Sequence, residues 1–326
     1  MIKYGGIISH RVFGAKQIMN QPMIFILGTT ACGKGRLAFC LAEKLRAEII
    51  SVDSMKVYRG MDIGTAKPPP AAREAVRHHL IDVVEPSQSF SAGLFVELAN
   101  KAVDQIKSRG RPVIAVGGTA LYIKALLYGL FEGPPADESV RRRLSAEART
   151  EGLEAVYGRL KLVDPAAAGR IHPNDQRRII RALEVYELSG SPISQLQKQF
   201  DSAGGPAGWK MIGLRRQRND NNARINSRVR SMVEAGLVDE VKALTAGGKR
   251  LGRQAAAAIG YAEIIEHLRG RVSLEESVEK IKINTRRLAK QQRTWFKRFA
   301  GVSWLDVEPD TPDDTVLEMA VGRLGI

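Results

Sequence analysis

Short apolar runs, separated by longer amphipathic stretches, form the first pattern in the chain. They lie at residues 23–27, 48–52, 80–84, 112–116 and 211–214. Their length and composition are typical of buried strands, and 211–214 would be the last of them. Residues 90–108 have apolar side chains at helical spacing and stop before Arg109-Gly110, which predicts a helix. This alternation predicts an α/β fold with a parallel sheet flanked by helices.

The pattern changes after residue 131. A linker at 132–137 contains Gly133 and two prolines, and from 138 to 190 the spacing is helical without a strand. We therefore expect an α/β core at 23–130 and 209–326, interrupted by a helical insertion domain at 131–208. Residues 1–22 contain no long apolar segment, so we expect an N-terminal extension without stable structure rather than a secretory signal.

The loop after the first apolar run contains the most specific motif. Residues 28–35 read Gly-Thr-Thr-Ala-Cys-Gly-Lys-Gly and match the P-loop pattern G-x-x-x-x-G-K-[ST] at every position but the last. In this motif, backbone N–H groups and the N-terminus of the next helix surround a phosphate, and the lysine reaches the outer phosphate. The alternative is a plain strand–turn–helix. The candidate binding residues are Gly28, Thr29, Thr30, Ala31, Cys32, Gly33, Lys34 and Gly35.

Net charge narrows the class of partner. The 326 residues include 50 Lys and Arg against 35 Asp and Glu, which gives a net charge of +15 and a pI near 10.0. This balance favours an anionic partner, nucleic acid first, although a merely basic protein is the alternative. Cys32 and Cys40 fit neither a metal nor a disulfide pattern, as in a reducing compartment. No run is long enough to span a membrane, so we expect a cytoplasmic protein.

Several polar residues are candidates for chemistry. Asp53 directly follows the second apolar run, where a carboxylate can act as a general base or metal ligand, or simply cap a turn. Arg224 and Arg228 share one helix face, which suits a phosphate clamp or a solvated surface. Thr65 and Lys67 suit phosphate contacts and turn chemistry equally well.

A basic segment lies near the end of the chain. Residues 282–298 contain seven basic side chains and no acidic one, which suits contact with a phosphate backbone. We expect the interleaved aromatic residues Trp295, Phe296 and Phe299 to pack in the core rather than stack on bases.

Taken together, these stretches resemble one family, the tRNA dimethylallyltransferases, also called tRNA isopentenyltransferases. The combination of IGTAKP at 63–68, VGGT at 116–119 and RIHPND at 170–175 is especially specific, and the resemblance covers about residues 23–306. The other matching stretches are 49–62, 78–92, 120–127, 164–169, 176–189, 258–261 and 285–296.

The resemblance implies transfer of a dimethylallyl group from dimethylallyl pyrophosphate to the exocyclic amine of the adenine 3′-adjacent to the tRNA anticodon, with release of pyrophosphate. It implies that the P-loop holds the donor's pyrophosphate, that Asp53 is the catalytic base and that Arg228 stabilises the pyrophosphate. It also implies a monomer, Mg²⁺ as cofactor, and contact with the tRNA anticodon stem-loop. The implied tRNA-binding residues are Asp53, Ser54, Met55, Lys56, Thr119, Arg141, Arg177, Arg178, Ile179, Ile180 and Arg181.

Several positions depart from the family pattern. Gly35 replaces the Ser or Thr of the P-loop, so the loop's contact with Mg²⁺ is in doubt, and Thr29 or Thr30 could replace it. Lys56 and Arg177 each replace an uncharged residue, usually glutamine. Three further departures are Thr29 in place of proline, Asn221 in place of leucine and Ala262 in place of lysine.

Two other functions are compatible with parts of the sequence. A P-loop kinase acting on a nucleoside or small metabolite would use the loop for ATP but would leave the helical insertion and the net charge unexplained. A tRNA-binding protein with a decayed P-loop would account for Gly35.

Overall fold

The computed structural model describes residues 23–131, 133–197, 208–248 and 250–326. The predicted extension at 1–22 lies outside these residues. The described chain forms two compact units. Residues up to Leu127 and from Gly208 onward make up one, here called the core unit, and residues from Tyr128 to Gln197 make up the other, the helical unit.

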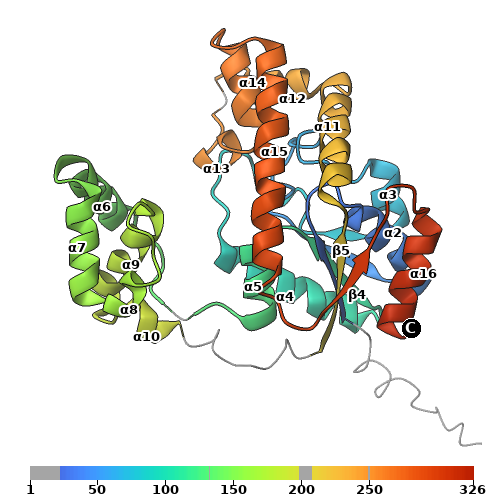
Figure 1. The fold of residues 1–326 in the computed structure, drawn as a ribbon, viewed down its shortest axis with the longest axis horizontal. Helices are drawn as coiled ribbons and strands as arrows, with labels where there is room; N and C mark the ends of the chain where they lie inside the picture. Colours follow the sequence, from blue (N-terminus) through green and yellow to red (C-terminus); the bar gives the residue numbers. More distant parts are fainter. Residues whose placement is uncertain (1–22, 132, 198–207, 249) are drawn as a thin grey trace, which may run out of the picture. The chain divides into compact units, whose positions relative to one another are not determined.

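The core unit contains one parallel sheet, which confirms the predicted fold class (Figure 1). Its strands run in the spatial order β3-β2-β4-β1-β5-β6, with β1 in the interior. All five pairings between neighbours are parallel. The strands are β1 Met23–Gly28, β2 Glu48–Val52, β3 His78–His79, β4 Val113–Gly117, β5 Trp209–Arg215 and β6 Val302–Asp306.

Helices cover both faces of this sheet. Side chains from one face, such as Ile24 and Ile26 of β1, pack in a buried cluster with α2 and α16. The other face carries α4 and α5, whose Phe95 and Tyr122 rings stack 4.3 Å apart. The core-unit helices are α2 Lys34–Leu45, α3 Pro70–Ala75, α4 Ala92–Ser108, α5 Ala120–Tyr128, α11 Arg218–Glu234, α12 Leu237–Thr245, α13 Arg253–Ala256, α14 Tyr261–Leu268, α15 Leu274–Phe296 and α16 Asp313–Leu324.

The helical unit has its own apolar core, which includes Leu144, Leu160, Ile179 and Leu183. Its helices are α6 Glu138–Thr150, α7 Leu153–Val163, α8 Pro165–Ala168, α9 Gln176–Ser189 and α10 Ile193–Leu196. The buried carboxylate of Glu184, on α9, accepts the backbone N–H of Asp137 at 2.7 Å. This bond ties the linker before α6 to α9.

Two strand predictions were wrong, and both concern the edges of the sheet. Residues 80–84 do not form a strand, because Leu80 and Asp82 have left-handed φ angles of 62° and 56°. The chain pairs with β2 two residues earlier, at β3. Residues 211–214 are not the last strand either, since β6 extends the sheet beyond β5.

The parallel register brings the carboxyl ends of β1, β4 and β2 to one edge of the sheet. Leu27 and Val52 are both opposite Gly117 of β4. A Cβ on Gly117 would lie 2.0 Å from the Val52 carbonyl oxygen, so this close approach requires glycine. The segments that follow these strands, at 28–35, 53–67 and 118–119, therefore begin side by side, as is usual for sites in α/β proteins.

Candidate active site

The loop between β1 and α2, residues 28–35, has the form of an anion-binding turn and is here called the donor loop. Ala31 and Gly33 have left-handed φ angles of 63° and 100°, and α2 begins at Lys34. The Lys34 ammonium donates to the Thr29 carbonyl at 3.1 Å. A helix N-terminus and a lysine beside such a turn together attract a phosphate.

Side chains from α11 and the residues before it hold the donor loop from outside. Arg216 Nε donates to the Cys32 carbonyl and Arg224 Nε to the Ala31 carbonyl, each at 3.0 Å. The buried Thr29 hydroxyl donates to Asn221 Oδ1 at 3.1 Å, so two of the departures from the family pattern are partners of each other. Arg224 thus supports the loop backbone, whereas Arg228 makes no hydrogen bond or ion pair with any described residue.

Asp53 follows β2 at the same edge of the sheet. Its Oδ1 accepts the backbone N–H groups of Met55 at 2.8 Å and Lys56 at 3.3 Å, so the turn-capping role considered for it is present. Its Oδ2 has no hydrogen-bond partner in the described part of the chain. One carboxylate oxygen therefore fixes the turn, and the other is available to accept a proton from a substrate.

Three cations interact electrostatically with this single carboxylate or with one another. Burial lowers the pKa of Lys34, while Asp53 acts in the opposite direction. Burial also lowers the pKa of Arg228. The pKa of Lys56 falls to about 8, mainly through burial and further through Lys34 and Arg228, although Asp53 raises it. Cations gathered in this way, with one opposing carboxylate, favour the binding of a polyanion.

We expect Lys56 to make pyrophosphate binding pH-dependent. Because its pKa is about 8, its ammonium loses a proton as the pH rises through that value, and one favourable charge disappears. Affinity for inorganic pyrophosphate should then fall by up to about tenfold more between pH 7 and pH 9 in the wild type than in Lys56→Gln. The affinities are measured by calorimetry for both proteins. Any contribution from the ionisation of Lys34 or of pyrophosphate is common to both and cancels in the comparison. Parallel pH curves would contradict the prediction.

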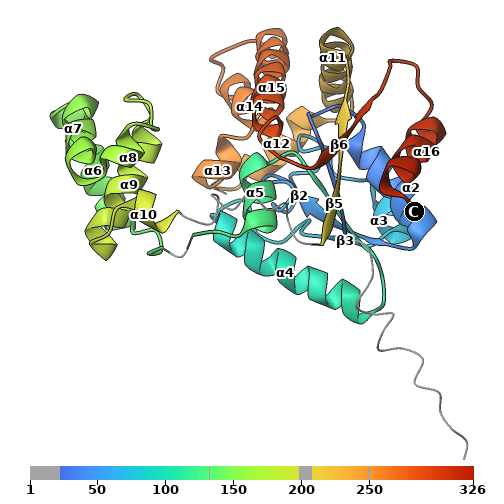
Figure 2. The ribbon, with the colours of Figure 1, turned by 60° about the horizontal axis from the view of Figure 1, so that its bottom comes forward.

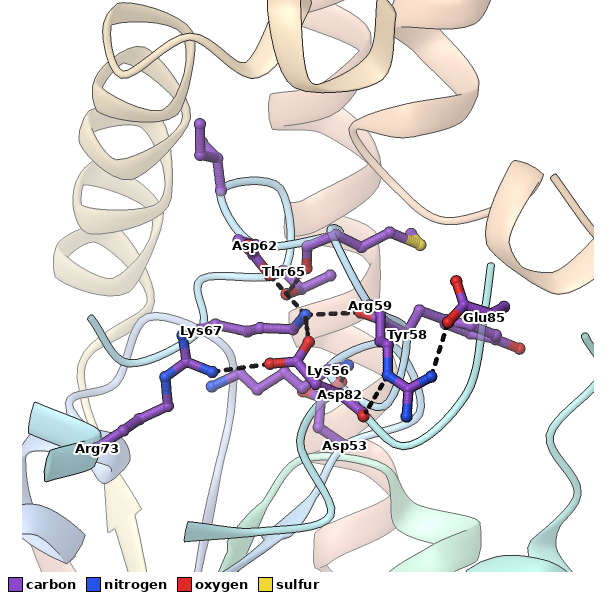
Figure 3. A network of polar contacts seen from close by, with 12 residues as sticks. Asp53, Lys56, Tyr58, Arg59, Asp62, Thr65, Lys67, Arg73, Asp82 and Glu85 are labelled. Carbon is purple, nitrogen blue, oxygen red and sulfur yellow. Dashed lines mark hydrogen bonds and ion pairs between the residues drawn. The ribbon is translucent and has the colours of Figure 1, made fainter. Parts of the chain in front are cut away.

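The segment after Asp53 is held by internal contacts (Figure 3). The Lys67 side chain is only 2% exposed and forms an ion pair with Asp62 at 2.6 Å and another with Asp82, and it also donates to the Tyr58 carbonyl. The Thr65 hydroxyl donates to the Met61 carbonyl at 2.6 Å. Of the two roles left open for Thr65 and Lys67, the structure thus supports the turn-forming one.

Glu240 of α12 supports the site from a distance, a role that sequence reasoning missed. Its carboxylate accepts the backbone N–H groups of Asp62 at 2.9 Å, Ile63 at 2.7 Å and Gly64 at 3.2 Å, and the Tyr261 hydroxyl at 2.6 Å. A Cβ on Gly64 would lie 2.5 Å from the Tyr261 ring. The IGTAK segment thus docks on α12 and α14, and this docking restrains the far end of the loop that begins at Asp53.

Thr119 joins two of the loops at the sheet edge. Its hydroxyl oxygen accepts the Ser54 N–H at 3.1 Å and lies 3.5 Å from the Ser54 hydroxyl. The structure therefore places the predicted site residues Asp53, Ser54, Lys56 and Thr119 at one edge of the sheet. Lys34 of the donor loop lies at the same edge.

In the helical unit, the predicted tRNA-binding residues differ in exposure. Arg141 and Arg181 form ion pairs with buried Glu184 at 2.9 and 2.6 Å. These pairs outweigh the effect of burial and lower the Glu184 pKa. The Ile179 and Ile180 side chains are buried in the unit's core and expose little or no surface. Among 177–181, only Arg177 and Arg178 are exposed.

A magnesium ion would find few protein ligands here. No group of three or more His, Cys, Asp or Glu side chains suited to a metal occurs among the described residues. Gly35 offers no hydroxyl, and the Thr29 hydroxyl is buried and donates to Asn221. Asp53 Oδ2 and the Thr30 hydroxyl remain. Since Mg²⁺ is often bound by one carboxylate together with substrate phosphates and water, the residues fit an ion that arrives on a diphosphate.

Fold and site together combine a P-loop-like turn, Lys34 and the Asp53 carboxylate at one edge of a parallel sheet. The sequence matches the IPP transferase family over residues 56–299. It is 48% identical to tRNA dimethylallyltransferase 2 of Geotalea uraniireducens, covering 87% of this chain and 92% of that one. It is 45% identical to the tRNA dimethylallyltransferase of Geobacter metallireducens, covering 94% and 99%. The chain belongs to the IPP transferase family, and both of these relatives are tRNA dimethylallyltransferases.

Solved structures are also similar. The full-length tRNA isopentenylpyrophosphate transferase of Bacillus halodurans matches with a TM-score of 0.68 and 42% identity, covering 94% of this chain and 97% of that one. A eukaryotic dimethylallyltransferase acting on tRNA matches with a TM-score of 0.76 and 28% identity, covering 92% and 78%. Separately, no helix in the described ranges is long and apolar enough to cross a membrane.

Proposed function

We propose that this protein transfers a dimethylallyl group from dimethylallyl pyrophosphate to the exocyclic amine of the adenine 3′-adjacent to the tRNA anticodon. The observation that carries the proposal is the arrangement at the sheet edge. A donor loop with Lys34 lies next to the Asp53 carboxylate, whose Oδ2 has no partner among the described residues, within a group of cations. A P-loop kinase would also use a phosphate loop and a carboxylate, so the match to the IPP transferase family over residues 56–299 is what favours prenyl transfer.

In the proposed reaction, the adenine nitrogen forms a bond to the allylic carbon while the carbon–oxygen bond to pyrophosphate breaks. The electron pair of the broken bond leaves with pyrophosphate, whose growing charge is stabilised by the donor-loop N–H groups, Lys34 and Arg228. The amine nitrogen is a weak nucleophile, because its lone pair is delocalised into the ring. Asp53 Oδ2 accepts its proton as the new bond forms.

The tRNA contacts are part of the proposal. In the core unit, Asp53 is followed in the chain by Ser54, Met55 and Lys56, and Thr119 is hydrogen-bonded to Ser54. These positions suit the four residues to hold a base that has left its stack. In the helical unit, exposed Arg177 and Arg178 are the residues best placed to bind phosphates. Arg141 and Arg181 pair with Glu184 but remain 36% and 28% exposed, which leaves part of each side chain accessible to RNA.

We further propose that the protein acts as a monomer in the cytoplasm, with Mg²⁺ as its cofactor. The Thr30 hydroxyl would contact such an ion, which would help to neutralise the charge on pyrophosphate, while Asp53 Oδ2 stays available for the amine proton. Because this ion has no hydroxyl ligand at position 35, its affinity should rest mainly on the diphosphate.

Gly35→Ser tests this interpretation of the metal. A Cβ at position 35 would meet no atom within 4 Å, so serine fits without strain, and its hydroxyl would lie at the position that usually binds Mg²⁺. We expect the affinity for Mg²⁺ in the presence of pyrophosphate, measured by calorimetry, to rise about tenfold. Gly35→Ala is the matched control and should resemble the wild type. If serine and alanine behave alike, another group already supplies the missing contact.

The function itself is tested with labelled substrates. Dimethylallyl pyrophosphate labelled in the prenyl group is incubated with tRNA, and γ-labelled ATP is incubated with nucleosides. The proposal predicts prenyl label on tRNA and none transferred from ATP. Label only on a phosphorylated nucleoside would support the kinase alternative. Normal tRNA binding without transfer at any Mg²⁺ concentration would support the alternative of a tRNA-binding protein with a decayed P-loop.

A further inference from the structure

Gln292 of α15 bridges two loops of the site. It is only 8% exposed. Its Oε1 accepts the backbone N–H of Thr30 in the donor loop at 2.8 Å, and its Nε2 donates to the Gly118 carbonyl, just after β4, at 2.9 Å. One carboxamide therefore connects the loop that binds pyrophosphate with the loop that carries Thr119.

Both contacts require the two different ends of a carboxamide. A carboxylate could accept the Thr30 N–H but could not donate to Gly118, and an aliphatic side chain could do neither. The space around the amide is also fixed, because a Cβ on Gly118 would lie 2.4 Å from Gln292 Nε2.

Helix α15, which carries Gln292, packs against the donor loop. Ala289 lies one turn earlier on α15 and forms a buried cluster with Ala31 of the donor loop and Ile225 of α11. Helices α11 and α15 run side by side in both views of the core unit (Figures 1 and 2). The bridge is therefore made from a supported element rather than from a mobile loop.

We infer that Gln292 is a positioning residue that sets the separation between the pyrophosphate and the catalytic carboxylate. The connection runs from Thr30 through Gln292 to Gly118, then along the chain to Thr119, whose hydroxyl oxygen holds Ser54 N–H beside Asp53. The bridge also occupies the Thr30 N–H, so the remaining donor-loop N–H groups receive the anion. This inference rests on the proposed function, because it assigns the bridge to prenyl transfer.

The test compares Gln292→Glu with Gln291→Glu, a control that places the same charge on the exposed neighbouring residue. Misplacement of reacting groups lowers the rate of the chemical step more than it weakens binding. We expect kcat of Gln292→Glu to fall roughly 10- to 100-fold, with both KM values within about threefold of the wild type. Gln291→Glu should retain wild-type kcat. Equal kcat in the two variants, or a loss confined to KM, would overturn the inference.

A pH profile distinguishes positioning from a merely structural role. When protonated, the introduced carboxyl can again accept from Thr30 and donate to Gly118. The kcat of Gln292→Glu relative to the wild type should therefore rise as the pH is lowered. The charged groups near the donor loop, Lys34, Arg228 and Asp53, are the same in both proteins. A ratio that does not change with pH would overturn the inference.

Gln292→Met keeps the test decisive if the glutamate variant does not fold. Methionine fills a similar volume but makes neither hydrogen bond, so it should lose kcat without recovery at low pH. Inorganic pyrophosphate binding and thermal melting establish that the variants are folded. If the wild type transfers no prenyl group, the proposed function fails. If the wild type is active and Gln292→Met matches it, only the role of Gln292 fails.

Discussion

Asp53→Asn is expected to slow prenyl transfer by about 10²–10⁴-fold, the usual contribution of a general base. Asparagine keeps an oxygen that can accept the Met55 and Lys56 N–H groups, so the turn bonded to Asp53 Oδ1 should remain. Its other terminal atom is an NH₂ nitrogen, which cannot accept the amine proton in place of Asp53 Oδ2. The loss should therefore appear in the single-turnover rate and leave the affinity for both substrates almost unchanged.

The control for this variant is Asp62→Asn, which removes a carboxylate of the same polar segment that pairs with Lys67. It should retain the chemical rate to within a few-fold, because Asp62 is exposed and Lys67 keeps its pair with Asp82. A single-turnover rate for Asp53→Asn within tenfold of the wild type would exclude Asp53 as the base.

Arg228→Met is expected to lower the rate of transfer by about 10²–10³-fold, as the loss of one preorganised donor to a developing anion does. Arg228 makes no hydrogen bond or ion pair within the described residues, and burial lowers its pKa. Its guanidinium is thus partly desolvated without a partner, a cost that binding of pyrophosphate would offset. Quenched-flow measurement of pyrophosphate release would show the loss directly.

Arg230→Met is the matched control for this variant, because Arg230 is exposed on the same helix. It should leave transfer unchanged apart from a weaker dependence on salt in tRNA binding. Arg224→Met should instead loosen the donor loop, since Arg224 holds the Ala31 carbonyl. If Arg230→Met and Arg228→Met were equally impaired, the loss would reflect general positive charge and not a specific contact.

The interior of the fold follows from the sequence, and its edges do not. Strands β1, β4 and β5 are largely buried on both faces and contain continuous apolar runs, and β2 is equally buried although it includes Glu48 and Ser51. The edge strand β6 is only partly buried at Val302, Ser303 and Trp304, and the polar residues Ser303 and Asp306 interrupt its apolar run. At the other edge, residues 80–84 turn and form backbone hydrogen bonds with Lys56 and Val57, which their apolar content alone does not reveal.

The site shows a similar division. Residues directly after strands, such as Asp53 and those of the donor loop, could be predicted because parallel strands end at a common edge. Gln292 and Glu240 could not, since a polar residue on an amphipathic helix looks the same whether it faces water or bonds to a distant loop. Lys67 was ambiguous for the same reason, and burial among Asp62, Asp82 and the Tyr58 carbonyl gives it a structural role.

The most direct measurement of the central claim is mass spectrometry of the nucleosides from an anticodon stem-loop after one turnover with dimethylallyl pyrophosphate. The account predicts one dimethylallyl group on the exocyclic nitrogen of the adenine 3′-adjacent to the anticodon, together with one equivalent of pyrophosphate. It also predicts no product when guanine replaces that adenine. An unmodified stem-loop, or a prenyl group on another atom, would contradict it.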